Sequence, residues 1–123
     1  MWDSRKEMVG NYVDKYSKIC NEKNLIESSL FEEYGVKRGL RDKSGRGVLT
    51  GLTNISLIQA YEEINGERVP CEGKLLYRGY DINDLVKGFV DNKRYGFEEI
   101  TYLLLFGSLP REKELQEFKK ILS

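Results

Sequence analysis

The chain has no histidine among its 123 residues and only two cysteines, which excludes several kinds of catalytic and metal-binding site. Without histidine it cannot itself supply a Ser-His-Asp triad, a Cys-His nucleophile pair or a histidine-ligated metal. Cys20 and Cys71 lie far apart and form no Cys-x-x-Cys motif, so the sequence does not support a structural zinc site. We therefore expect no metal, and two buried or idle thiols in a reducing compartment.

The chain also lacks an excess of either charge and any long apolar run. Lysine plus arginine and aspartate plus glutamate each number 20, which argues against a dedicated nucleic-acid binder but leaves room for a local anion site. The longest apolar run, Tyr102–Phe106, is far too short to span a membrane. Met1–Gly10 has no apolar signal-peptide core. We expect a soluble cytoplasmic protein that contacts neither nucleic acid nor membrane.

Apolar periodicity and turn signals predict a mainly α chain with one small β region. The stripe from Val9 to Cys20 indicates a helix, which the polar run Asn21–Asn24 should interrupt, and Gly35 suits the C-cap of a second helix. Glycines and basic residues then alternate in a segment typical of a loop. The expected elements are helices at about 5–20 and 25–34, a Gly/Arg-rich loop at 35–53, short strands within 54–77, and helices at about 82–90, 97–106 and 110–122.

Further residue signals refine the hairpin and the last three helices. Asn65-Gly66 predicts a two-residue hairpin turn with Glu63 opposite Arg68, and Pro70 should end the returning strand or confine it to an edge. Asp81 suits the N-cap of the helix at 82–90. The segment 97–106 is apolar on most sides and should be buried on most sides, while Pro110 suits the first turn of the last helix.

Three features carry a functional interpretation beside a structural one. The loop at 35–53 fits no dinucleotide or Walker fingerprint, so it is either an anion site or a solvated loop. Glu32-Glu33, Glu62-Glu63 and Glu98-Glu99 are neighbours whose side chains point apart, which favours solvated faces over acid–base chemistry. Tyr77–Asp81 is typical of a pinned strand-to-helix corner, where Arg78 is a candidate for an internal ion pair and Gly79 permits an unusual backbone conformation.

Three segments in register resemble the citrate synthase family. They are Gly47–Ser56 (GVLTGLTNIS), Gly73–Leu85 (GKLLYRGYDINDL) and Phe97–Pro110 (FEEITYLLLFGSLP), and the resemblance covers about Gly39 to Leu115. It implies an acyltransferase of the tricarboxylic acid cycle that condenses acetyl-CoA with oxaloacetate to citrate and CoA, or the closely similar 2-methylcitrate synthase. It also implies a homodimer of helix-rich chains, each with a large and a small domain, without a metal in the chemistry. Residues 1–123 then correspond to the N-terminal segment of the helical large domain, and its partner is the remainder of the synthase chain.

In the family that this chain resembles, two histidines and one aspartate carry the chemistry, and they lie downstream of the leucine-proline motif. The resemblance therefore implies no catalytic residue here, and we expect the isolated chain to be inactive. It implies a CoA thioester as a substrate and no tightly bound cofactor. An arginine in the early glycine-rich loop of some members reaches the CoA phosphates, and Arg41 is the first candidate for that role and Arg46 the second. The alternatives are a free-standing helical interaction or dimerisation module derived from this fold, and a helical domain of unknown use.

Overall fold

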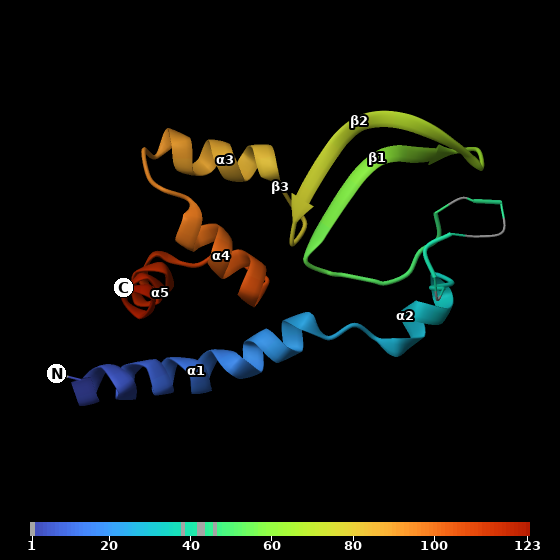
Figure 1. The fold of residues 1–123 in the computed structure, drawn as a ribbon. Helices are drawn as coiled ribbons and strands as arrows, with labels where there is room; N and C mark the ends of the chain where they lie inside the picture. Colours follow the sequence, from blue (N-terminus) through green and yellow to red (C-terminus); the bar gives the residue numbers. More distant parts are fainter. Residues whose placement is uncertain (1, 38, 42–43, 46) are drawn as a thin grey trace.

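The structure is a computed structural model that describes residues 2–37, 39–41, 44–45 and 47–123. Helices dominate it, and a small antiparallel sheet interrupts them (Figure 1), so the predicted mainly α class is confirmed. The elements are α1 (Trp2–Asn24), α2 (Ser28–Glu33), β1 (Ser56–Ile64), β2 (Glu67–Tyr77), β3 (Tyr80–Asp81), α3 (Ile82–Asp91), α4 (Phe97–Phe106) and α5 (Glu112–Leu122).

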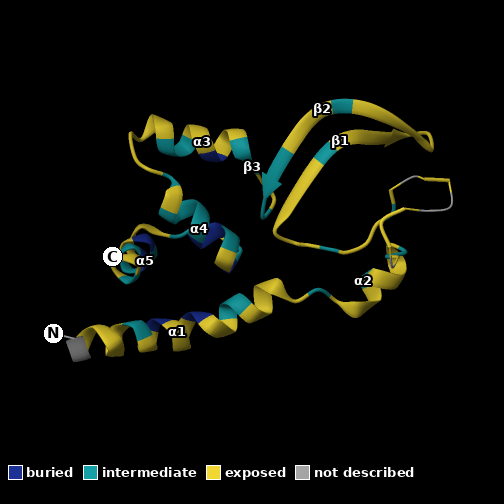
Figure 2. Ribbon diagram, in the orientation of Figure 1, coloured by how far each residue is buried: buried dark blue, intermediate teal, exposed yellow. Residues whose placement is uncertain are grey.

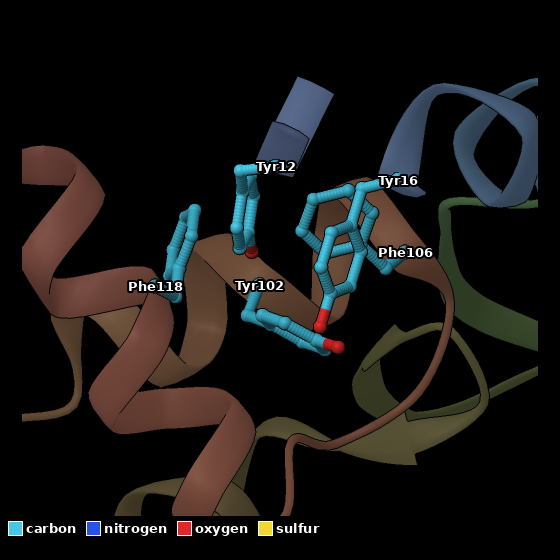
Figure 3. Close-up of a cluster of buried hydrophobic side chains, with 5 residues drawn as sticks. All are labelled: Tyr12, Tyr16, Tyr102, Phe106 and Phe118. Carbon is cyan, nitrogen blue, oxygen red and sulfur yellow. The ribbon is translucent and has the colours of Figure 1, made fainter. Parts of the chain in front are cut away.

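Aromatic side chains from α1, α4 and α5 form the core (Figure 3). The rings of Tyr12 and Tyr16 stack at 4.2 Å between centroids, and Phe106 lies 4.9 Å from Tyr16 and 4.6 Å from Tyr102. Phe118 of α5 closes the cluster. Offset and edge-on pairs of this kind add to the stability that burial provides. The predicted stripe of α1 is thus confirmed at its tyrosines, although Val13 on the same stripe is 54% exposed.

Helix α4 begins and ends where the sequence predicts, but only one of its faces is buried. Leu103 is fully buried, whereas Phe97 is 73% and Leu105 42% exposed. The prediction of burial on most sides is therefore wrong for the outer face. The physical reason is that α1 and α5 both pack against the side of α4 that carries Tyr102 and Phe106. Figure 2 shows buried, intermediate and exposed residues within this one helix.

Three predicted helix boundaries change in the structure. Helix α1 continues through Asn21–Asn24, so the expected interruption there is wrong. Helix α2 begins at Ser28 rather than near residue 25, and it ends in a Schellman motif in which Gly35 has the predicted left-handed conformation, with φ +59°. Pro110 lies before α5 rather than in its first turn, because Arg111 is the N-cap and its N–H donates to the carboxylate of Glu114.

Strands β1 and β2 form a hairpin that extends away from the helical core (Figure 1). Its turn uses Asn65 and Gly66, both with positive φ, and Glu63 pairs with Arg68 as predicted. Strand β2 runs through Pro70, so the prediction that this proline ends the strand is wrong. The edge alternative is confirmed, because Pro70 pairs with Tyr61 of β1 while β3 reaches only Leu76 and Tyr77 of β2.

Candidate functional site

The loop at 35–53 is closed by its own backbone. The N–H of Lys37 donates to the carbonyl of Leu49 at 2.7 Å, and the N–H of Val48 donates to that of Leu40 at 3.2 Å. A β-bridge joins Arg41 to Gly47. The described part of this segment forms no helix and no longer strand, which confirms the predicted loop.

Arg41, the first candidate for binding an anion, is exposed on this loop. Its Nη1 donates to the carbonyl of Gly45 at 2.7 Å, which fixes the guanidinium to its own loop. Guanidinium carries five N–H donors in a planar fork, so Arg41 retains donors for an anion. Arg46, the second candidate, lies outside the described residues.

The corner between β2 and β3 has the conformation that its sequence predicts. Gly79 has φ +87°, and Arg78 itself has φ +50°, a left-handed conformation that is uncommon for a residue with a side chain. The backbone N–H of Arg78 donates to the carbonyl of Ile55 at 2.8 Å. The corner is therefore tied to the segment that enters β1, and it directs the Arg78 side chain toward the helices.

The guanidinium of Arg78 joins the C-terminal ends of two helices. Its Nε and Nη2 donate to the carbonyl of Leu104 in α4, at 3.2 and 2.8 Å, and its Nη1 donates to the carbonyl of Lys23 in α1, at 3.0 Å. Helix C-termini carry partial negative charge and unpaired carbonyls, which a cation stabilises. A positive charge at this position therefore favours the observed meeting of α1 and α4.

Two asparagines complete this arrangement, which we call the Arg78 clamp (Lys23, Asn24, Asn54, Arg78 and Leu104). The side-chain oxygens of Asn24 and Asn54 each accept from the guanidinium at 2.8 Å, and Nδ2 of Asn54 donates to the carbonyl of Lys23 at 2.8 Å. The predicted ion pair is wrong, because carbonyl and amide oxygens take its place. Sequence reasoning missed both asparagines, although Asn54 lies inside the first segment of the resemblance.

A small pocket of about 160 Å³ lies beside the clamp, between residues 53–57 and the corner formed by Leu76, Arg78 and Gly79. Pockets for drug-sized ligands and cofactors measure roughly 300–1,000 Å³, so this one is too small for a nucleotide-sized molecule. Because the donors of Arg78 already hold protein oxygens, the clamp positions chain segments and does not present a free cation.

Beyond the loop and the clamp, the described residues offer little further candidate chemistry. Glu32-Glu33 and Glu62-Glu63 are exposed as predicted, but Glu99 is half-buried and forms an ion pair with Arg94, so the prediction of a solvated face is wrong there. Within the described ranges no three cysteine, aspartate or glutamate side chains come together as metal ligands. No helix in the described part of the chain is long and apolar enough to cross a bilayer.

Comparisons with known proteins agree on one family. The family model described as "Citrate synthase, C-terminal domain" matches residues 39–123. Citrate synthase of Saccharolobus solfataricus is 39% identical over 85 residues, which are 68% of this chain and 17% of that protein. 2-Methylcitrate synthase 1 of Corynebacterium glutamicum is 35% identical over 83 residues, 68% of this chain and 16% of that protein. 2-Methylcitrate synthase of Mycobacterium tuberculosis is 29% identical over 102 residues, 83% of this chain and 21% of that protein.

The matches therefore span about a fifth or less of the length of these relatives. No solved structure matches the chain significantly. The family model nevertheless covers well over half of the chain, and it includes the Arg78 clamp from Asn54 onward and all of α3, α4 and α5. The chain belongs to the citrate synthase family.

Proposed function

We propose that the chain is the N-terminal part of the helical large domain of a citrate synthase, an acyltransferase that condenses acetyl-CoA with oxaloacetate to citrate and CoA. The observation that supports this most is the match of residues 39–123 to the citrate synthase family model, together with the citrate and 2-methylcitrate synthases that are 39% and 35% identical to the chain. In this proposal its partners are the rest of the synthase chain and, in the complete enzyme, a second subunit. A cytoplasmic location fits the two cysteines, which are both free thiols.

Within such an enzyme the described residues serve as a scaffold. The Arg78 clamp fixes the end of α1 against the end of α4 and the start of β1, and the Gly/Arg-rich loop leads directly into it. Arg41, and Arg46 after it, would bind the phosphates of the CoA thioester, which is a substrate rather than a tightly held cofactor. The exposed guanidinium of Arg41 and its anchoring at Gly45 support this role.

The Arg41 role is tested in a chimera in which residues 39–123 replace the matching segment of the Saccharolobus synthase. We expect this chimera to make citrate, and Arg41→Ala to raise its KM for acetyl-CoA several-fold while kcat changes little, because the arginine holds a phosphate remote from the reacting carbon. Arg68→Ala, on the exposed hairpin, is the control and should leave KM unchanged. Equal KM values for the two variants would refute the Arg41 role, and an inactive chimera that folds would count against the synthase proposal.

By itself the 123-residue chain should be catalytically silent, because it contains no histidine for the family's chemistry. The measurement is the loss of thioester absorbance when the chain meets acetyl-CoA and oxaloacetate. Thioester absorbance is preferred to a thiol reagent as the readout, because a thiol reagent would count any reaction with the half-buried, free Cys20 and Cys71 together with released CoA. We expect the same slow loss with and without oxaloacetate, and turnover that depends on oxaloacetate would contradict the proposal.

A free-standing helical interaction module is the second candidate. The observation that favours it is the apolar side chains that α4 and the segment before it expose: Tyr95 is 91%, Phe97 73% and Leu105 42% exposed. A module of this kind would associate through that face, so Phe97→Glu should abolish its self-association. An active chimera would decide for the synthase.

A further inference from the structure

The turn of the β1–β2 hairpin contains the one Asn-Gly pair of the sequence, Asn65-Gly66. Both residues are exposed, and the turn lies at the end of the hairpin away from the helical core (Figure 1). No hydrogen bond holds the Asn65 carboxamide or the N–H of Gly66 within the described part of the chain. The carboxamide carbon Cγ and the backbone nitrogen that follows it are therefore both free to react and open to water.

The other asparagines differ from Asn65 in both respects. Each is followed by a residue with a side chain, which crowds the next backbone nitrogen. Hydrogen bonds of 2.6–3.0 Å hold the carboxamide nitrogens of four of them, Asn24, Asn54, Asn83 and Asn92. The remaining two lie within α1, where interior N–H groups donate along the helix. Among the described residues, Asn65 alone combines a free carboxamide with an uncrowded nitrogen.

The turn has access to the conformation that brings these two atoms together. Asn65 has φ +54° and Gly66 has φ +81°, which is the pattern of a type I′ turn. A five-membered ring that joins Cγ to the Gly66 nitrogen eclipses this nitrogen with Cβ of Asn65. For an L-residue this requires ψ of about −120°, the value at the first central position of a type II′ turn.

Rotation of a single peptide unit, the one between Asn65 and Gly66, converts a type I′ turn into a type II′ turn. Both types close a two-residue hairpin, and glycine adopts either sign of φ without strain. The hairpin therefore reaches the reactive conformation without any loss of strand pairing.

We propose that Asn65 is a site of spontaneous modification, where cyclisation and hydrolysis convert the asparagine to aspartate and isoaspartate. The Gly66 nitrogen attacks Cγ of Asn65, so that an N–Cγ bond forms and the Cγ–Nδ2 bond breaks. The proton of the Gly66 N–H leaves with Nδ2 as ammonia. Water then opens the succinimide ring. Hydrolysis of the N–Cγ bond gives aspartate, and hydrolysis of the bond from this nitrogen to the backbone carbonyl carbon gives isoaspartate.

The two products differ in their effect on the hairpin. Each adds one negative charge to a tip that already carries Glu62, Glu63 and Glu67 beside Arg68. Aspartate leaves the backbone unchanged, and Asp-Gly suits a type I′ turn as Asn-Gly does. Isoaspartate directs the main chain through its side-chain carbonyl and lengthens the turn by one methylene. Because turn length sets the register of a hairpin, isoaspartate should unpair Ile64 from Glu67 and loosen the adjacent residues.

This modification is independent of the synthase proposal, since it involves no residue of the Gly/Arg-rich loop, the clamp or α4. The test is timed incubation of the 123-residue chain at physiological temperature, at neutral and at mildly alkaline pH, followed by peptide mapping with mass spectrometry. We expect Asn65 to lose its amide about tenfold or more faster than Asn92, an exposed asparagine that precedes lysine and donates to the carbonyl of Gly88. The rate should rise with pH, because the attacking nitrogen must lose its proton.

Two variants at position 65 serve as controls. Asn65→Gly retains a two-residue turn and has no carboxamide, so its tip should release no ammonia. Asn65→Asp carries the added charge on an unchanged backbone, so its hairpin should remain paired. Methylation by a carboxyl methyltransferase that acts on isoaspartate should label the aged wild type and not the fresh chain.

Amide hydrogen exchange measures the effect on the hairpin. In chains that carry isoaspartate, residues 62–69 should exchange about tenfold or more faster than in the fresh chain, while the fully buried Leu103 keeps its protection. Equal rates at Asn65 and Asn92, a rate at Asn65 that does not rise with pH, or aspartate as the sole product would each overturn the proposal. Exchange in Asn65→Asp as fast as in the isoaspartate chain would overturn the role of the lengthened backbone.

Discussion

Replacing Arg78 should destabilise the fold more than replacing any exposed arginine. In Arg78→Ala the carbonyl of Leu104 loses two donors in a half-buried position, which costs about 1–3 kcal/mol. The carbonyl of Lys23 and the asparagine oxygens are exposed and regain water, so together they add about 1 kcal/mol. The expected loss is about 3 kcal/mol, a large part of the roughly 5–15 kcal/mol that stabilises a typical domain.

A second variant separates the effect of losing the guanidinium from the effect of backbone strain at position 78. Arg78 has φ +50°, which alanine also finds strained and glycine does not. Arg78→Gly should therefore be about 0.5–1 kcal/mol more stable than Arg78→Ala, although both lack the guanidinium. Arg78→Lys keeps the charge but not the planar fork, so it should recover less than half of the loss.

The assay is urea denaturation followed by far-ultraviolet circular dichroism, with thermal melting as a second measurement. A loss of about 3 kcal/mol corresponds to a fall in Tm on the order of 10 °C for a chain of this size. Arg68→Ala, an exposed arginine that lies over the Tyr61 ring, is the matched control and should change stability by less than about 0.5 kcal/mol. If Arg78→Ala and Arg68→Ala unfold at the same urea concentration, the clamp does not hold the helices together. If Arg78→Lys matches the wild type, charge alone suffices and the forked geometry is irrelevant.

Two further predictions concern the core. Leu103 is fully buried, whereas Leu105 on the same helix is 42% exposed. Measured by urea unfolding, Leu103→Ala should therefore lower the free energy of unfolding by about 2–5 kcal/mol and Leu105→Ala by under about 1 kcal/mol. Equal losses for the two variants would contradict the one-sided burial of α4. Burial raises the pKa of Tyr12 and of Tyr102 well above the usual value of about 10 for tyrosine. Both are neutral below that pH in the folded and unfolded chain, but above it the unfolded chain loses protons first, so stability should fall as the pH rises beyond about 10. Absorbance of tyrosinate against pH should show both ionising together with unfolding, and Tyr12→Phe with Tyr102→Phe should flatten the fall; ionisation of all tyrosines near pH 10 in a folded chain would refute this.

Signals that act over a few residues predicted their elements well. The apolar run before Gly107 defined α4, the carboxylate of Asp81 accepts from the N–H of Asn83 as an N-cap should, and Asn65-Gly66 set the hairpin register. In each case the hydrogen bonds or dihedral angles that define the boundary lie within the segment itself. The loop that contains Arg41 was predicted for the same reason, because glycine and basic residues leave no apolar face to bury.

What only the tertiary structure decided are contacts between residues remote in the sequence. The segment Asn21–Asn24 has the local composition of a helix break, yet α1 continues through it. The carbonyl of Lys23 accepts hydrogen bonds there from Asn54 and Arg78, which are 31 and 55 residues away in the sequence. Arg78 donates to carbonyl oxygens rather than to a carboxylate, because the C-terminal ends of α1 and α4 both lie beside it. No local sequence pattern specifies that these two helix ends come together. The sequence by itself determined the family, the mainly α class and the local caps. The clamp and the one-sided burial of α4 required the packed chain, since each depends on which remote surfaces come together.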